Sequence, residues 1–456
     1  MNLMLMAAVA FWHYWVFLLL QEIRKQYNGD DNADKLSDLP DCVLLHILSF
    51  LNTKYAVQTC VLSKRWKNLW KCLPSLKIGY SNSKCLRGSK NIFYLLFRPR
   101  YISSACQVFD FKEPQNFEKF LNGCLSNRDQ SIPLQVFDCV GPQIHIESIV
   151  KTLPQNLFKL YCHTLTSLHV SVASPQRTLF PNSLNFPALT SLSLWSFDFR
   201  VGGDGNVEPF SAFKRLKNLI LRDCNVHANR NLCISSATLI NLAIDYCNLE
   251  LYTPSLCTFV YKGIPTVQQL CGSKSNLSSV KHVNIDVNID AISLSESVKT
   301  SLILYNWLVE LANIESLTIN STILEILYSV PNILKAEFPS LCNLKSLKVK
   351  TNLSSIPNGY LAFLLQNAPS AKVYLLPHCS RVKLLGMNFV VHQLEVLNLS
   401  DTKVDDETLH VISKNCCGLL ELLLKDCYYV TKKEVKHVEE NCTQLRLFSN
   451  RGCLLC

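Results

Sequence analysis

Few residues in this sequence have the types and spacing that chemistry requires. Cys453 and Cys456 have the C-x-x-C spacing of a metal-binding pair, but no second pair and no nearby histidine completes a zinc site. Asp405, Asp406 and Glu407 stand where a helix is predicted to begin, so helix capping explains their charges better than acid–base catalysis does. The eleven histidines are dispersed, and the motifs of serine hydrolases, phosphate-binding loops and zinc proteases are missing. The sequence therefore predicts a protein that is not an enzyme and holds no metal or cofactor.

The densest pattern in the chain is a short helical segment, LSDLPDCVLLHILSFLNTKYAVQTCVLSKRWKNLW, at residues 36–70. Pro40 suits the first turn of a helix, and Thr53 and Ser63 are predicted to cap two further short helices. Helical spacing predicts one apolar face on the first helix, made of Val43, Leu44, Ile47, Leu48 and Leu51. Fewer than about 40 residues rarely close a core without help, so the surplus apolar surface predicts a partner.

The pattern LPDxxLxxILSFL followed by TKxAVxTxVLSKRWKxLW resembles the plant F-box. In that family the segment docks on the Skp-type adaptor of a cullin–RING ubiquitin ligase. Trp66 and Trp70, at helical spacing, are residue types that often anchor interfaces. Carried over position by position, the resemblance implies that the adaptor contacts or their immediate support are Leu39, Pro40, Leu44, Ile47, Leu48, Leu51, Val61, Leu62, Trp66 and Trp70.

Two other interpretations of this segment remain. The apolar residues could form one face of an ordinary helical subdomain. The basic residues between Lys64 and Lys71 could instead belong to a helix-turn-helix. A recognition helix needs polar base-reading side chains, however, where this segment has Trp66 and Trp70.

The rest of the chain repeats the pattern L-x-x-L-x-L, mostly every 23 to 30 residues, which is at or near the period of leucine-rich repeats. The repeats start at Leu165, Leu189, Leu216, Leu239, Leu256, Val280, Ile314, Leu344, Leu394, Leu419 and Leu445. The long gap before Leu394 leaves room for one degenerate repeat around residues 371–376. We therefore expect an α/β solenoid, a leucine-rich-repeat horseshoe with a parallel inner sheet, preceded by a small all-α F-box.

The predicted domains are a hydrophobic N-terminal extension at 1–33, the F-box at 34–78, a linker at 79–115 and the solenoid at 116–452. The repeats at 394–450 resemble the cysteine-containing type, with a helix at 405–414 between strands. Together these segments resemble the plant F-box/leucine-rich-repeat family. Because the 21 cysteines are scattered through a long chain, reduced structural thiols are expected at positions such as Cys224, Cys247, Cys416, Cys427 and Cys442.

A target protein would contact the residues between and just after the inward-facing leucines, because these point out of the repeat core. Trp195 and Arg222 are the residue types most often found at interface hot spots. The net charge of +10 is mild and its clusters lack interleaved aromatics, which favours an acidic protein partner over nucleic acid. The candidate target-binding residues are His169, Trp195, Arg222, Asp245, Lys262, Asp286, Lys348, Lys350, Asn398 and Lys425.

Residues 1–20 carry no charge and are long enough to cross a bilayer as a helix. They could anchor the chain, with Arg24 and Lys25 keeping the F-box on the cytosolic side, or they could be an upstream extension from a mistaken start codon or a helix packed on protein. A signal peptide is disfavoured because the basic first region is missing. The expected location is the cytoplasm or nucleus, with membrane association if the segment is genuine.

The resemblance to this family implies a substrate-recruiting subunit of an SCF-type ubiquitin ligase. The alternative is a non-catalytic leucine-rich-repeat interaction protein, membrane-anchored or not, that is not assembled into a ligase.

Overall fold

The computed structural model describes residues 39–79, 114–141, 163–172, 177–180, 186–200, 208–226, 231–271, 277–287, 294–328, 341–351, 371–377, 395–400, 404–425 and 427–449. The chain forms two units, Met1–Asp198 and Phe199–Cys456. The N-terminal extension, most of the expected linker at 79–115, and Cys453 and Cys456 lie outside the described residues.

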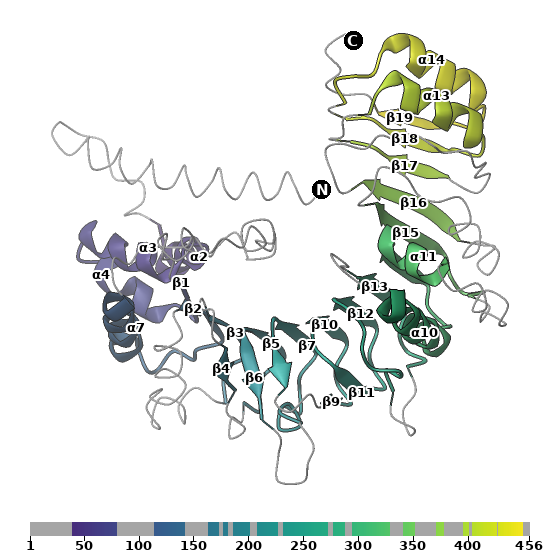
Figure 1. Cartoon of the computed structure of the whole chain (residues 1–456). Coiled ribbons are helices and arrows are strands. Elements are labelled where there is room, and N and C mark those ends of the chain that lie inside the picture. Colours follow the sequence, from purple (N-terminus) through teal and green to yellow (C-terminus); the bar gives the residue numbers. More distant parts are fainter. Residues whose placement is uncertain are drawn as a thin grey trace, which may run out of the picture. The chain divides into compact units, whose positions relative to one another are not determined.

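Short helices form the N-terminal part of the first unit (Figure 1). They are α2 (Asp41–Ser49), α3 (Thr53–Gln58), η1 (Thr59–Val61), α4 (Trp66–Leu69) and η2 (Trp70–Cys72). Helix α2 begins directly after Pro40, as the sequence predicts.

The two caps predicted for the later helices are wrong. Asn52 caps α3, because its Oδ1 accepts a hydrogen bond from the Tyr55 amide at 3.1 Å. The hydroxyl of Thr53 instead accepts a hydrogen bond from the Lys77 amide at 2.9 Å, which joins α3 to the next strand. Ser63 does not cap α4, since that helix begins after Arg65 and has no side-chain cap.

A parallel sheet follows the helices of the first unit. Its strands, in spatial order, are β1 (Ser75–Gly79), β2 (Val136–Gly141), β3 (Ser167–Val172) and β5 (Ser191–Trp195). Helix α7 (Pro114–Asn127) precedes β2, and two short strands, β4 (Thr178–Leu179) and β6 (Phe197–Phe199), pair with each other. The sheet thus begins with β1, inside the segment assigned to the F-box.

The second unit continues the repeat pattern with a longer parallel sheet. Its strands, in spatial order, are β7 (Asn218–Arg222), β10 (Asn241–Asp245), β12 (Thr258–Lys262), β13 (His282–Asp286), β14 (Ser316–Asn320), β15 (Ser346–Thr351), β16 (Lys372–Pro377), β17 (Val396–Asn398), β18 (Glu421–Leu423) and β19 (Leu447–Ser449). Each predicted L-x-x-L-x-L start lies two residues before a strand, and the degenerate repeat at 371–376 is β16.

The return segments of the second unit contain short strands and helices. The strands are β8 (Asn225–Val226), β9 (Leu232–Ser235) and β11 (Leu249–Tyr252), and the helices are α10 (Leu294–Glu310), α11 (Ser321–Tyr328), α13 (Asp406–Asn415) and α14 (Lys432–Asn441). Helix α13 confirms the helix predicted at 405–414. Among the helices that the structure describes, none combines the length and apolar composition that a bilayer-spanning helix requires.

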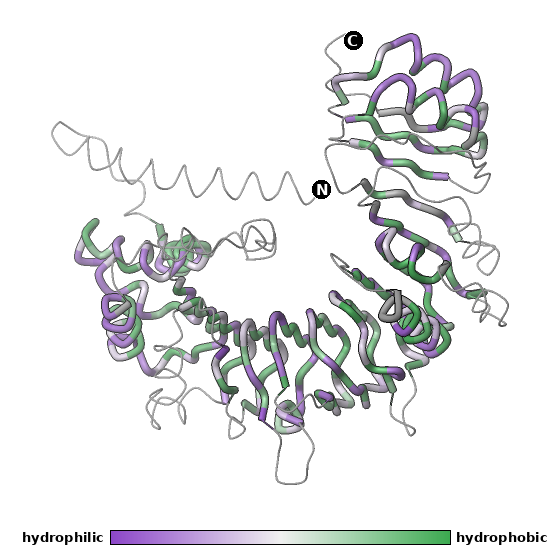
Figure 2. Tube along the Cα trace, viewed as in Figure 1, coloured by the Kyte–Doolittle hydropathy of each residue, from purple (hydrophilic) through white to green (hydrophobic). Residues whose placement is uncertain are grey.

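The core lies between the sheet and the return segments, and alternation along each strand creates it. Leu219 and Leu221 on β7 and Leu242 and Ile244 on β10 are at most 1 % exposed, whereas the residues between them are partly exposed. Figure 2 shows hydrophobic and hydrophilic stretches alternating along the chain through the repeats. The chain is therefore an α/β solenoid of leucine-rich repeats. The five repeat cysteines expected in the core, at 224, 247, 416, 427 and 442, are all buried.

Candidate partner-binding surfaces

The helices of the F-box segment close a small core around the two tryptophans. Trp66 is 5 % exposed and Trp70 is 7 % exposed, so neither is available as a direct interface anchor in the described structure. Leu44 and Leu48 on α2 are fully buried against them. These residues support the surface rather than form it, because their apolar area is already removed from water.

Helix α2 has a second apolar strip on its outer side. Val43 is 38 % exposed and Phe50 is 45 % exposed, and Ile47 between them is partly exposed. The spacing i, i+4, i+7 places these three side chains on one side of the helix. Val61 at the end of η1 is 87 % exposed. Helix α2 therefore has apolar residues on both its inner and its outer side, and the outer ones are partly exposed among the described residues.

The ten residues assigned to adaptor binding therefore divide by exposure. Buried residues are Leu44, Leu48, Leu51, Trp66 and Trp70, partly exposed ones are Leu39, Ile47 and Leu62, and exposed ones are Pro40 and Val61. Phe50 and Val43 belong to the exposed strip but were not among the ten. The apolar spacing along α2 predicts one face that includes both Val43 and Leu44. In the structure Leu44 is buried and Val43 is exposed, so the two residues lie on different sides of the helix.

The basic residues near α4 do not form a recognition helix. Helix α4 has four residues, and both tryptophans near it are buried. Arg65 Nη2 lies 2.6 Å from Asp41 Oδ1 and also donates a hydrogen bond to the Leu39 carbonyl, so this cation holds the start of α2. Because the Arg65–Asp41 pair is largely exposed, it adds at most about 1 kcal/mol to stability.

A row of polar and charged side chains crosses the sheet of the second unit near the carboxyl ends of its strands. We call it the charged row, and it consists of Arg222, Asp245, Lys262, Asp286, Asn320 and Lys350. The strand register pairs Asp245 with Lys262, Lys262 with Asp286, and Asn320 with Lys350. Five of the ten target-binding candidates thus lie on neighbouring strands.

The charges within the charged row are partly neutralised by one another. Arg222 Nε lies 3.9 Å from Asp245 Oδ2, and Lys350 Nζ lies 3.8 Å from Asp286 Oδ2. Burial raises the pKa of Asp245, and the nearby cations Arg222 and Lys262 oppose that rise. These side chains are about one quarter exposed in the two ion pairs, so a partner can still reach them.

Asn320 was missed as a member of the charged row. It is 1 % exposed, and its Nδ2 donates hydrogen bonds to Asp286 Oδ1 at 2.9 Å and to the Val287 carbonyl at 2.6 Å. Its position at the end of the motif IESLTIN matches that of Asp286 and Lys350 in their own repeats, which is the pattern that could have identified it.

The other target-binding candidates lie outside the charged row as defined. Lys348 on β15 pairs with Tyr374 on β16 in the strand register, and its Nζ lies 5.8 Å from the centroid of the Tyr374 ring. Asn398 ends β17 and accepts a hydrogen bond from the Ser400 amide, while Lys425 is exposed beyond the end of β18.

Two candidates belong to the first unit. His169 Nε2 lies 3.9 Å from Asp138 Oδ1 on the neighbouring strand, and both side chains are less than one third exposed. Trp195 ends β5 and is partly exposed. Both residues belong to the first unit, whereas the charged row belongs to the second.

Comparison with known proteins agrees with this division into helices and repeats. Residues 36–77 match the F-box domain family. An F-box/LRR-repeat protein of Arabidopsis thaliana is 31 % identical over 234 residues, which cover 48 % of this chain and 72 % of that relative. A second such protein of the same plant is 30 % identical over 260 residues, and the match spans 55 % of its length. An F-box/FBD/LRR-repeat protein, also of Arabidopsis thaliana, is 25 % identical over 429 residues, which cover 87 % of each chain.

The matched F-box coincides with the helices that contain Trp66 and Trp70, and the strands that follow carry the L-x-x-L-x-L repeats of this chain. The chain therefore belongs to the plant family of F-box/leucine-rich-repeat proteins.

Proposed function

We propose that this F-box protein is the substrate-recruiting, non-catalytic subunit of an SCF-type ubiquitin ligase. The F-box binds a Skp-type adaptor and through it the cullin–RING machinery, and the leucine-rich repeats bind a target protein. The chain contributes proximity and orientation, because holding a target beside the transferring machinery raises its effective concentration.

The observation that carries this proposal is the outer apolar strip of the F-box. The core of the F-box already buries Trp66, Trp70 and the inner face of α2, whereas Val43, Phe50 and Val61 stay exposed. Burying a fully exposed side chain of this type contributes about 1.5–3 kcal/mol, so covering Val61 contributes most of that amount and covering Val43 or Phe50 roughly half of it or less. A partner with a complementary apolar groove therefore gains affinity from these residues.

The charged row is the proposed part of the target-binding surface. Positive and negative side chains alternate from Arg222 to Asp286. The charged row therefore favours partners whose own charges have the matching order and spacing, and not only the matching net charge. The target is a protein whose surface carries the opposite alternation. We place the complex in the cytoplasm or nucleus, where such thiol-rich proteins stay reduced.

Adaptor binding is tested with the double variant Phe50→Asp and Val61→Asp. We expect adaptor recovery from the purified full chain to fall at least about tenfold, because each substitution places a carboxylate in an apolar interface. Both residues are exposed, so circular dichroism and thermal unfolding should match those of wild type. Leu48 and Trp66 are poor choices for this test, since substitutions there remove core packing.

The double variant Ile240→Asp and Ile264→Asp provides the matched control, because these residues are 38 % and 40 % exposed in the second unit and the variant gains the same charge. It should leave adaptor recovery unchanged. Full adaptor recovery by the Phe50→Asp, Val61→Asp variant would contradict the proposal and would favour a repeat protein that acts outside a ligase.

Target binding is tested by affinity purification under proteasome inhibition, followed by mass spectrometry. The double variant Lys262→Ala and Lys350→Ala should lose proteins that wild type retains. The control Lys281→Ala and Lys345→Ala removes two lysines that contact Glu315 before the strands, outside the charged row. Equal loss in both variants would mean that the charged row has no special part in recognition.

A further inference from the structure

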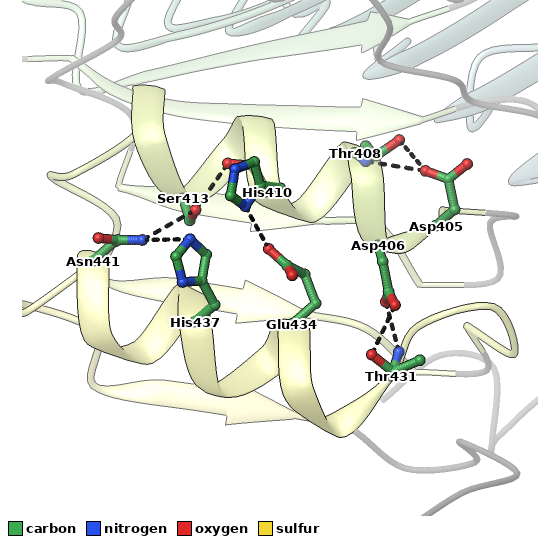
Figure 3. Close-up of polar contacts among 9 residues, drawn as sticks. All are labelled: Asp405, Asp406, Thr408, His410, Ser413, Thr431, Glu434, His437 and Asn441. Atoms are coloured by element: carbon green, nitrogen blue, oxygen red, sulfur yellow. Dashed lines mark hydrogen bonds and ion pairs between the residues drawn. The ribbon is translucent and has the colours of Figure 1, made fainter.

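A cluster of potential metal ligands lies on the two C-terminal helices, far in sequence from the F-box. His410 on α13 and Glu434 and His437 on α14 place one ligand atom each within 4.8 Å of one another. His410 Nδ1 lies 3.0 Å from Glu434 Oε1, and the two imidazole rings are stacked with centroids 4.8 Å apart (Figure 3). Within the part of the chain that the structure describes, no other such group of three was found.

The sequence places these residues together through the repeat. Glu434 and His437 are separated by three positions, so they lie on one side of α14. His410 precedes Glu434 by 24 residues, close to one repeat period, and α13 and α14 lie side by side on consecutive repeats (Figure 1). The motif E-x-x-H and a histidine about one repeat earlier are compatible with such a cluster, but only the register of α13 against α14 brings the three side chains together.

We infer that His410, Glu434 and His437 form a binding site for a divalent transition metal ion, Zn²⁺ in the first instance. Two imidazoles and one carboxylate are a ligand set that Zn²⁺ accepts, and three protein ligands leave a fourth position for water or another ligand. This inference goes beyond the proposed function and does not depend on it.

The arrangement without metal needs only a local change to bind the ion. The two rings are nearly parallel, at 12°, so the lone pairs of their nitrogens do not converge as they stand. The second side-chain torsion of histidine is broad, and rotation of one ring about it brings a nitrogen toward the other two ligands. Tetrahedral Zn²⁺ with ligand bonds of about 2.0–2.2 Å needs ligand atoms roughly 3.4 Å apart, which the 3.0 Å contact already approaches.

Polar contacts around the cluster hold its ligands near the position required. Asn441 Nδ2 lies 3.1 Å from His437 Nε2 and 3.4 Å from Ser413 Oγ, and Ser413 donates a hydrogen bond to the His410 carbonyl (Figure 3). With the ion bound through His437 Nδ1, Nε2 carries the proton, and the Asn441 amide must turn so that its Oδ1 accepts that proton. A contact of that kind fixes the orientation of a metal-bound imidazole. The side chains of His410 and Glu434 are 43 % and 15 % exposed, so an ion can enter from solvent.

The bound ion would link two consecutive repeats, α13 to α14, through side chains rather than through the backbone. Since it would bind the folded arrangement and not the unfolded chain, it would also stabilise this end of the solenoid.

The test is a Zn²⁺ titration of the reduced full-length chain in competition with a chromophoric chelator. Wild type should bind one equivalent more than His410→Ala, Glu434→Gln or His437→Gln. Exposed thiols that also bind Zn²⁺ are present in every variant, so only the difference in equivalents is informative. Replacing Zn²⁺ by Co²⁺ should show that the lost equivalent has d–d bands without the near-ultraviolet charge-transfer bands of thiolate ligands.

His282→Ala is the matched control, because it removes an exposed histidine from β13 of the same unit. It should bind as many equivalents as wild type. Thermal unfolding should show a Zn²⁺-dependent rise in wild type and in His282→Ala that Glu434→Gln lacks. Equal stoichiometry in wild type and all three cluster variants would overturn the inference and leave an ordinary histidine–carboxylate contact.

Discussion

Two adjacent cysteines show how one residue step along the chain changes chemistry. Cys416 is 1 % exposed at the end of α13, whereas Cys417 is exposed. Burial raises the pKa of the Cys416 thiol from 9.0 to about 12. Since only the thiolate is a strong nucleophile, the two neighbours should differ in reactivity despite their shared backbone.

We predict that iodoacetamide at pH 8 labels Cys417, Cys42 and Cys342 in the native full chain but leaves Cys416 unlabelled. At this pH only about one Cys416 thiol in 10⁴ is ionised, and its sulfur is also inaccessible. Peptide mass spectrometry after brief labelling measures the difference, and labelling in denaturant is the control in which Cys416 reacts. Comparable native labelling of Cys416 and Cys417 would contradict the buried position of Cys416.

The raised pKa of Cys416 also makes the free energy of unfolding depend on pH. The folded state holds the Cys416 proton up to about pH 12, whereas the unfolded chain releases it near pH 9.0. The contribution is therefore complete below pH 9 and is lost as pH rises from 9 toward 12. Replacing Cys416 by Ala should flatten the alkaline fall in the free energy of unfolding, which chemical denaturation between pH 8 and pH 11 measures.

At the scale of the element, the acidic residues at the start of α13, Asp405, Asp406 and Glu407, show how carboxylates stabilise helices and the contacts between them. Asp405 caps the helix, because its Oδ1 accepts hydrogen bonds from the Thr408 amide at 3.0 Å and the Thr408 hydroxyl at 2.7 Å. Asp406 instead accepts hydrogen bonds from the amide and hydroxyl of Thr431, both at 2.7 Å, at the start of the next helix (Figure 3). One carboxylate begins a helix and its neighbour joins two repeats.

We predict that Asp405→Ala lowers the free energy of unfolding by about 1 kcal/mol through loss of the cap, and that Asp405→Asn loses less. Asp406→Ala should cost about 1–3 kcal/mol, because the Thr431 amide loses its partner in a partly buried position. Hydrogen exchange of the full chain separates the two, with faster exchange at the start of α13 for the first variant and at the start of α14 for the second. Glu407→Ala, at an exposed position on α13, is the control.

At the scale of the whole molecule, the strand pattern was predictable and the surfaces were not. The inward positions of L-x-x-L-x-L repeat with a fixed period, so all the predicted starts precede strands. The same pattern exists at Leu73, Leu76 and Ile78, which are at most 3 % exposed and lie within the segment expected to be the F-box. Strand β1 forms there, although the resemblance implies a helical F-box.

The candidate sites depend on distances between repeats that a single repeat does not determine. The outer strip of α2 is distinguishable from the inner face only once the core around Trp66 is known. The His410, Glu434 and His437 cluster requires the register of α13 against α14, which the period of the strands does not fix. Sequence spacing did place Arg222, Asp245 and Lys262 correctly, because strand register carries these residues to adjacent positions.

Within the first unit, contacts join the end of the F-box segment to the segment between α7 and β2. Arg128, which follows α7, is 3 % exposed, and its Nη2 donates a 2.6 Å hydrogen bond to the carbonyl of Leu73, where η2 gives way to β1. Backbone hydrogen bonds from Gln135 to Pro74 and from Asp129 to Lys71 run beside it. The end of the F-box segment is thus joined to the segment between α7 and β2 by one buried side-chain contact and by backbone hydrogen bonds.

We therefore predict that Arg128→Met lowers the free energy of unfolding of the first unit by about 1.5–3 kcal/mol, the range for hydrogen bonds made by a charged group. Folded Arg128→Met protein should still bind the adaptor, because Arg128 is buried away from solvent and contributes nothing to the exposed strip of Val43, Phe50 and Val61. Chemical denaturation and adaptor co-purification at low temperature measure the two effects separately. Lys119→Met, at an exposed position on α7, should change neither. Full stability of Arg128→Met would show that the F-box folds without this link. A folded Arg128→Met protein that fails to bind the adaptor would show that the adaptor-binding surface extends toward α7.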